Sequence, residues 1–205
     1  MGDLYGNAPD RSSIALILID VINGLEFPGG DLLARRALPM AQALAGLVQR
    51  ARRSAIPIVY ANDNFGRWRS DFRTLLGHCL ERDVPGRPIA ELLRPEEVDY
   101  FVLKPKHSGF YATALELLLT HLEARTLVLT GIAAENCVLF TAHDAYLRDY
   151  GLIVPSDCVA SQNPADSERA LVQIRQVLKG DVRSSADVDF EALKRVGRGR
   201  GGRSS

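Results

Sequence analysis

The chain has 205 residues, of which 46% are hydrophobic and 24% charged, so it has the length and composition of one globular domain with a substantial core. Its formal net charge at pH 7 is zero, which gives the fold as a whole no electrostatic basis for binding nucleic acid or an anionic membrane surface. Five basic residues and no acidic one occupy the last twelve positions, so the rest of the chain carries a formal charge of about −5.

Short apolar runs alternate along the chain with longer amphipathic segments. Runs that are apolar at every position, such as residues 14–19 (IALILI), are typical of strands buried on both faces of a parallel sheet. In the segments between them, apolar residues recur at spacings of three and four, which is the helical period. In chain order we predict a strand at 14–19, a helix at 32–51, a strand at 56–61, helices at 69–81 and 89–93, a strand at 100–104, a helix at 112–122, a strand at 126–130, a helix at 135–149, a strand at 152–155, a helix at 165–178 and a short strand at 181–183.

This alternation predicts an α/β fold: a three-layer α/β/α, doubly wound domain with a mostly parallel sheet of about six strands, of the Rossmann-like class. We divide the chain into an N-terminal arm at 1–11, one domain at 12–190 and a basic, Gly/Arg-rich tail at 191–205. The tail offers no apolar face to offset the entropy of ordering, so we expect it to be disordered. Its arginines are the only basis for a nucleic-acid role, and tails of this kind are more often solvated chain ends, so we expect no nucleic-acid partner.

The cysteines and the N-terminus indicate a cellular location. Cys79, Cys137 and Cys158 are odd in number and widely spaced, and they form neither a CxxC pair nor a Cys/His cluster. This pattern argues against a disulfide framework or a structural metal. The N-terminal residues include acids and no apolar stretch, unlike a signal peptide, and the run at 14–19 is too short to cross a bilayer. We expect a cytoplasmic protein with reduced thiols and no membrane association.

Three chemically different polar residues fall where predicted strands end. Asp20 follows the first strand, Lys104 ends the third, and Cys137 opens the helix after the fourth. In an open α/β sheet the carboxyl ends of neighbouring strands lie about 4.8 Å apart at one edge, where ligands bind. A cysteine in the first turn of a helix, beside a lysine, favours the thiolate, and a carboxylate can carry its proton. The sequence therefore predicts a low-pKa thiol at Cys137.

Each of these residues also has a purely structural explanation. A single cysteine in an apolar context is commonly an inert core residue, and an aspartate after a strand often caps a helix or turn. Lys104 precedes Pro105 and fits a solvated strand end. The argument for catalysis therefore depends on the three residues coming together.

Three segments resemble those of the isochorismatase-like cysteine hydrolases, the superfamily of isochorismatase, nicotinamidase and N-carbamoylsarcosine amidase. Residues 17–23 (ILIDVIN) resemble the family's aspartate segment, 102–110 (VLKPKHSGF) its lysine segment, and 130–138 (TGIAAENCV) its nucleophile segment. They occur in the family's order and at comparable intervals. The resemblance covers roughly residues 12–185 at the level of strand and helix alternation.

The resemblance implies a hydrolase with Asp20, Lys104 and Cys137 as a catalytic triad. In the family's mechanism the aspartate takes the thiol proton, the lysine stabilises the thiolate, and the cysteine attacks a carbonyl carbon to form a thioester. The resemblance also implies an oxyanion hole made by the backbone amides of Ala133 and Cys137, and a cis peptide between Ile132 and Ala133. We expect a small-molecule substrate, no cofactor and, since relatives commonly assemble, a homo-oligomer.

Two departures from the family pattern narrow the expected chemistry. The metal motif Asp-x-His of nicotinamidase-like members here reads Asp63-Asn64-Phe65, and the nearest downstream histidine is His78. One carboxylate and one histidine make a poor zinc or iron site, so we predict no metal. Vinyl-ether hydrolases of the isochorismatase type need no thiol, so Cys137 favours cleavage of an amide-like C–N bond. Vinyl-ether hydrolysis and a non-catalytic, ligand-binding role remain the alternatives.

Polar and aromatic residues near the expected edge of the sheet are candidates for substrate binding, with ordinary packing as an equal alternative. The sequence shows no partner for His107, His121 or His143, and we expect these histidines on the surface or on helix faces. The substrate-binding candidates are Asn64, Phe65, Trp68, Phe110 and Tyr111.

Overall fold

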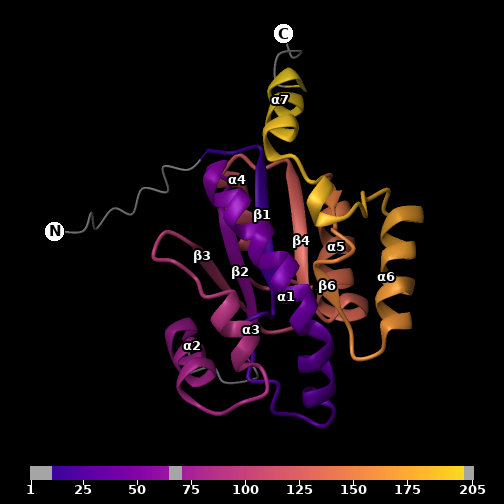
Figure 1. Cartoon of the computed structure of the whole chain (residues 1–205). Helices are drawn as coiled ribbons and strands as arrows, with labels where there is room; N and C mark the ends of the chain where they lie inside the picture. Colours follow the sequence, from indigo (N-terminus) through magenta and orange to yellow (C-terminus); the bar gives the residue numbers. More distant parts are fainter. Residues whose placement is uncertain (1–10, 65–70, 201–205) are drawn as a thin grey trace, which may run out of the picture.

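The structure, a computed structural model, describes residues 11–64 and 71–200, without the side chains of 196–200. Its centre is a parallel sheet in the order β3-β2-β1-β4-β5, with β6 added beside β4 (Figure 1). The predicted six-stranded, three-layer α/β fold is confirmed. The strands are β1 (Ile14–Ile19), β2 (Ile58–Asp63), β3 (Tyr100–Lys104), β4 (Thr126–Ile132), β5 (Gly151–Ile153) and β6 (Val159–Ala160).

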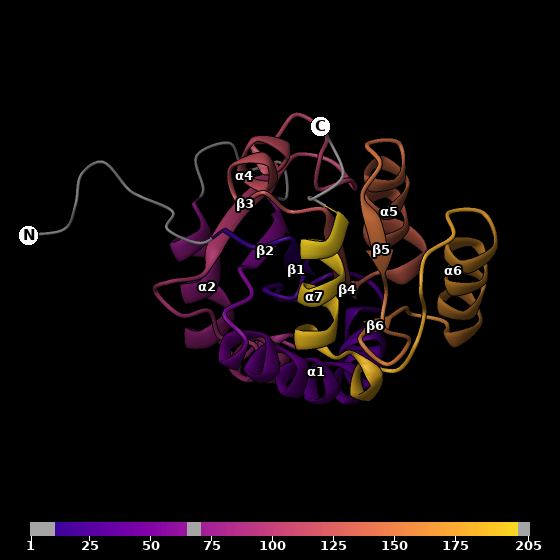
Figure 2. The same cartoon turned by 90° about the horizontal axis from the view of Figure 1, so that it is seen from above.

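Helices cover both faces of the sheet, as Figure 2 shows for α1 on one side and α4 and α5 on the other. Strand β1 lies between β2 and β4, and all six of its residues are buried. Its Leu16 and Leu18 pack with the apolar face of α1, whereas Ile17 and Ile19 pack with α4, α5 and α6. Burial on both faces explains why this strand is apolar throughout rather than alternating. The helices are α1 (Gly30–Arg53), α2 (Phe72–Glu81), α3 (Arg87–Leu92), α4 (Leu115–His121), a π-helical turn η1 (Ala134–Val138), α5 (Leu139–Tyr146), α6 (Pro164–Gln176), a 3-10 turn η2 (Ser185–Asp187) and α7 (Phe190–Arg200).

The structure differs from the sequence-based prediction at several element ends. The predicted last strand at 181–183 is reduced to one bridge between Asp181 and Ile153, and the two-residue β6 takes a place in the sheet instead. Strand β2 runs on to Asp63, which pairs in register with Lys104 of β3. This extension matters for function because it brings a second carboxylate to the edge of the sheet where Lys104 ends.

Helix α7 occupies much of the segment predicted to be a disordered tail. Phe190 is 3% exposed and belongs to the part of the core that lies between the sheet and α1. Leu193 packs against this part of the core. Lys194 donates a hydrogen bond from Nζ to the carbonyl oxygen of Ser54. The expected disorder therefore does not hold for α7, because two apolar side chains one turn apart anchor its start. The helix lies beyond the amino ends of the strands (Figure 1).

Two further observations concern cysteines and membranes. Cys79, Cys137 and Cys158 are all buried, and none forms a disulfide. Within residues 11–64 and 71–200, no helix combines the length and the apolar character needed to cross a membrane.

Candidate active site

The three polar residues singled out in the sequence come from three elements at one edge of the sheet. Asp20 directly follows β1, Lys104 is the last residue of β3, and Cys137 lies in η1 after β4. Asp20 has a φ of 54°, in the left-handed region that aspartate tolerates better than most residues. Such conformations cost energy and concentrate at functional sites.

The side chains of these residues meet. The Lys104 ammonium nitrogen lies 2.8 Å from Asp20 Oδ2 and 3.5 Å from Cys137 Sγ. It also donates to the carbonyl oxygen of Lys106 at 3.3 Å and lies 3.6 Å from Asp63 Oδ2. The other carboxylate oxygen of Asp20 accepts a hydrogen bond from the Asp63 amide at 2.6 Å. We call Asp20, Lys104 and Cys137 the Asp–Lys–Cys cluster.

The cluster is almost completely withdrawn from water. Lys104 is 0% exposed, Asp20 4% and Cys137 9%. Burial of an ammonium is costly unless opposite charges surround it, and here Asp20 and Asp63 supply them. Burial lowers the pKa of Lys104, but the charges of Asp20, Cys137 and Asp63 outweigh it and the pKa is raised, so the side chain stays an ammonium.

The carboxyl group of Asp20 binds a proton more readily than a surface aspartate does. Burial raises its pKa, although the Lys104 ammonium and hydrogen bonds with Cys137 and the Asp63 amide act in the opposite direction. A carboxylate with a raised pKa is a better proton acceptor, which is the property required of a general base.

The Cys137 thiol is not acidic, and the prediction of a low pKa is wrong. Burial and, next, the negative charge of Asp20 raise its pKa to about 12, while Lys104 lowers it. The helix start and the lysine, on which that prediction rested, do not outweigh the loss of solvent and the adjacent anion. The resting group is therefore a thiol, and a thiolate forms only if a neighbour takes the proton.

The backbone around Cys137 is irregular. It lies in a π-helical turn, a feature frequent at functional sites. The peptide bond between Ile132 and Ala133 is cis. The carbonyl oxygen of Ala133 accepts hydrogen bonds from the amides of Asn136 and Val138, the two residues that flank Cys137.

The structure places a histidine, His107, next to Cys137, although the sequence shows no partner for it. Nδ1 of His107 lies 3.8 Å from Cys137 Sγ, and the imidazole ring packs against Phe140, with ring centroids 5.4 Å apart. His107 is exposed, in contrast to the buried Asp20. Its position three residues after Lys104 is the only sequence signal that could have drawn attention to it.

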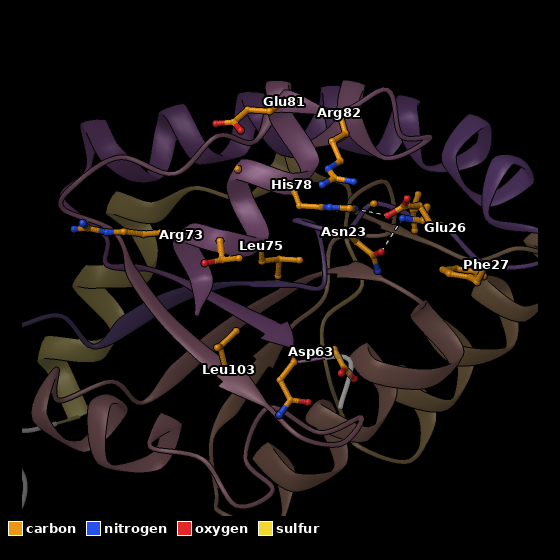
Figure 3. A pocket seen from close by; sticks show the side chains of 15 residues that line it. Asn23, Glu26, Phe27, Asp63, Arg73, Leu75, His78, Glu81, Arg82 and Leu103 are labelled. Atoms are coloured by element: carbon orange, nitrogen blue, oxygen red, sulfur yellow. Dashed lines mark hydrogen bonds and ion pairs between the residues drawn. The ribbon is translucent and has the colours of Figure 1, made fainter. Parts of the chain in front are cut away.

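A pocket of about 800 Å³ opens beside the cluster. The loop after β1, the end of β2 and helix α2 form its walls (Figure 3). Asp63 in this lining lies 3.6 Å from the Lys104 ammonium, whereas Asp20, Lys104 and Cys137 are not among the described lining residues. Figure 3 shows His78 and Glu26 pointing toward one another, and their side chains form an ion pair when the histidine is protonated. The described lining residues are Asn23, Gly24, Leu25, Glu26, Phe27, Asp63, Asn64, Arg73, Thr74, Leu75, Gly77, His78, Glu81, Arg82 and Leu103.

The substrate-binding candidates have different positions. Asn64 lines the pocket. Phe110 is 5% exposed and packs instead in the core, against the ring of Tyr150 and under the guanidinium of Arg148. Tyr111 is 59% exposed, and neither it nor Phe110 is among the described lining residues. The other two candidates, Phe65 and Trp68, lie outside the described residues.

No group of three or more His, Cys, Asp or Glu side chains among the described residues is arranged to hold a metal ion. Asp63, which matches the metal-binding aspartate of nicotinamidase-like proteins in sequence, faces the Lys104 ammonium instead. A lysine charge competes with a cation for the same carboxylate oxygens.

Comparison with known proteins gives a consistent result. The family model described as the isochorismatase domain matches residues 14–187. The isochorismatase family protein YaaI of Bacillus subtilis (strain 168) is 39% identical over 178 residues, which cover 87% of this chain and 97% of that protein. An N-carbamoylsarcosine amidase from an Arthrobacter species is 28% identical over 200 residues, covering 90% and 71% of the two chains. The crystal structure of the nicotinamidase PncA from Bacillus subtilis superimposes with a TM-score of 0.66 at 26% identity, covering 84% of this chain and 99% of that one.

Proposed function

The chain belongs to the isochorismatase family, and from this premise we propose that it is a cysteine hydrolase that cleaves an amide-like C–N bond of a small molecule. The observation that carries the proposal is the contact of Lys104 Nζ with both Asp20 Oδ2, at 2.8 Å, and Cys137 Sγ, at 3.5 Å. A nucleophile, a cation and a proton acceptor in mutual contact beside a pocket are the minimum required for acyl transfer.

The relatives support hydrolysis of a C–N bond. Several are named as amidases or amidohydrolases, among them the N-carbamoylsarcosine amidase and a maleamate amidohydrolase from Pseudomonas putida. Because vinyl-ether cleavage needs no thiol, a cysteine in contact with lysine and aspartate favours the amide reaction. A pocket of about 800 Å³ is of the size that small-molecule sites commonly have.

In the proposed acylation step, Asp20 accepts the proton of the Cys137 thiol as sulfur attacks the substrate carbonyl carbon. Lys104 stabilises the developing thiolate, which the raised thiol pKa makes necessary. Backbone amides of Ala133 and Cys137 hold the oxyanion of the tetrahedral intermediate. The C–N bond then breaks, the Asp20 proton passes to the leaving amine, and a thioester remains on Cys137.

The proposal also covers the need for a metal or cofactor and the assembly of the protein in solution. We propose that the reaction needs neither metal nor organic cofactor, because Asp63 is already engaged by Lys104. We also propose a homo-oligomer in solution, which light scattering coupled to size-exclusion chromatography tests.

A substrate panel tests the proposed chemistry. Small amides, carbamoyl compounds and isochorismate are assayed with the wild type and with Cys137→Ala. Cys79→Ala is the matched control, because Cys79 is also buried but lies on α2, on the opposite face of the sheet from Cys137. We expect ammonia or amine release that requires Cys137 alone, and an acyl adduct on this residue in intact-protein mass spectra. Turnover that survives Cys137→Ala would refute the thioester mechanism, and turnover of isochorismate alone would favour vinyl-ether hydrolysis.

A further inference from the structure

Hydrolysis of the thioester that acylation leaves on Cys137 requires a base that an incoming water can reach, and the buried Asp–Lys–Cys cluster does not offer one. A thioester on Cys137 must be hydrolysed by water, and that water needs a base to accept its proton. Asp20 is 4% exposed, and both of its carboxylate oxygens are already engaged, by Lys104 and by the Asp63 amide. The Asp20 carboxylate is therefore poorly accessible to an incoming water.

His107 occupies the solvent side of the same sulfur. Its Nδ1 lies 3.8 Å from Cys137 Sγ, and the residue is exposed, so it borders the solvent from which a water arrives. At 3.8 Å the nitrogen makes at most a weak hydrogen bond to the thiol itself. Imidazole is also the side chain best suited to accept a proton near neutral pH.

The chain holds this histidine in place from both sides. The preceding carbonyl, of Lys106, accepts a hydrogen bond from the Lys104 ammonium at 3.3 Å. Ser108 Oγ donates to the Asp144 carboxylate, and the Gly109 amide donates to Thr141 Oγ1 at 3.0 Å. The ring of Phe140, on α5, also packs against the His107 imidazole. Contacts with Lys104 and with α5 therefore hold the exposed His107 side chain beside Cys137.

We propose that His107 is the general base of thioester hydrolysis, a second catalytic base beside Asp20. This assignment rests on the proposed function. Water attacks the thioester carbonyl carbon while the imidazole takes a proton from it. The tetrahedral intermediate then collapses, the C–S bond breaks, the departing sulfur takes the proton back from His107, and the acid product leaves. The two half-reactions thus use two different bases beside one sulfur, one buried and one exposed.

The test uses 4-nitrophenyl acetate, which places an acetyl group on a reactive cysteine and releases coloured nitrophenolate in doing so. His107→Gln keeps the size and the hydrogen-bonding capacity of the side chain but cannot act as the base. We expect a nitrophenolate burst of about one equivalent, followed by a steady rate lower than that of wild type by about 10²-fold or more. Mass spectra of this variant should show one acetyl group on Cys137.

Two rescues separate a base from a structural role. Both are read on the acetylated variant after excess ester has been removed, because hydroxylamine and imidazole also cleave 4-nitrophenyl acetate directly. Hydroxylamine should strip the acetyl group from Cys137 of His107→Gln, and added imidazole should accelerate its loss from His107→Ala, both followed by intact-protein mass. His121→Gln, which changes an exposed histidine at the end of α4, serves as the control and should match wild type.

Two outcomes for the variants would overturn the assignment. Loss of the burst in His107→Gln would show that the histidine acts on the thiol during acylation. Unchanged burst and steady rate would show that it has no part in the reaction. A failure of the proposed function is recognised separately, because the wild type would then release no nitrophenolate that depends on Cys137, and the assignment of His107 would fall with it.

Discussion

Replacing Asp20 by Asn should make Cys137 more reactive toward a simple alkylating agent and at the same time make the enzyme much slower. The amide keeps the shape of the carboxyl group but can neither accept the thiol proton nor repel the thiolate. The proposed roles of Asp20 therefore predict changes of opposite sign in two assays of the same sulfur.

The magnitude follows from the state of the thiol. With the pKa of Cys137 raised to about 12, only about 10⁻⁴ of it is thiolate at pH 8. Removal of the Asp20 charge leaves the Lys104 ammonium, 3.5 Å from the sulfur, with Asp63 as its remaining carboxylate neighbour, and lowers the pKa of the thiol. A fall to the ordinary value of about 8.5 would raise the thiolate fraction more than ~10³-fold. Since burial remains and a less basic thiolate is a weaker nucleophile, we expect a gain of roughly 10- to 100-fold in alkylation rate.

The assay measures iodoacetamide modification by peptide mass spectrometry between pH 7 and 10, with the fully buried Cys79 and Cys158 as internal controls. Turnover of Asp20→Asn should fall by about 10²–10⁴-fold. Lys104→Met, which removes the cation, should lower both alkylation and turnover. If alkylation falls in Asp20→Asn, the carboxylate does not raise the pKa of the thiol. Unchanged turnover in the same variant would refute its assignment as the base.

Three other predictions concern metal, backbone and tail. Turnover should survive exhaustive chelation; a loss that zinc, iron or manganese reverses would show that Asp63 belongs to a metal site. Gly131→Ala should lower the urea midpoint and turnover together, because the glycine has a φ of +113° and a Cβ there would lie 2.0 Å from the carbonyl oxygen of Ile19; wild-type behaviour would contradict the described backbone. Phe190→Ala should cost about 3 kcal/mol, a fall in Tm of roughly 6–12 °C, whereas deletion after Arg195 should leave Tm and turnover unchanged. Calorimetry that finds the reverse order would show that the chain end, not Phe190, secures α7.

The fold could be predicted because its main signal is local. Residues 14–19 are apolar without interruption, and only burial on both faces of a sheet accommodates such a strand. The meeting of Asp20, Lys104 and Cys137 followed from the same argument, since parallel strands end at one edge. Their catalytic roles stay a prediction until the variants are measured.

What could not be predicted depends on quantities that no sequence pattern carries. The pKa of Cys137 is set by the balance of burial, the Asp20 carboxylate and the Lys104 ammonium. The sequence does not reveal how deeply a residue at the start of a helix is buried. The position of His107 depends on hydrogen bonds from Ser108 and Gly109 to side chains on α5. The ordered start of α7 depends on Phe190 and Leu193, two apolar residues at the head of a segment whose composition is otherwise that of a tail.

The order of the strands has a consequence for biosynthesis and quality control. Asp20 follows β1, yet β1 pairs with β4, more than a hundred residues later in the chain, and Cys137 follows that strand. The nascent chain therefore cannot assemble the site until most of the protein has left the ribosome. Long-range parallel pairing of this kind is slow compared with helix formation. A partly folded or truncated chain should accordingly lack a competent nucleophile, so that recovery of activity during refolding reports completion of the central sheet.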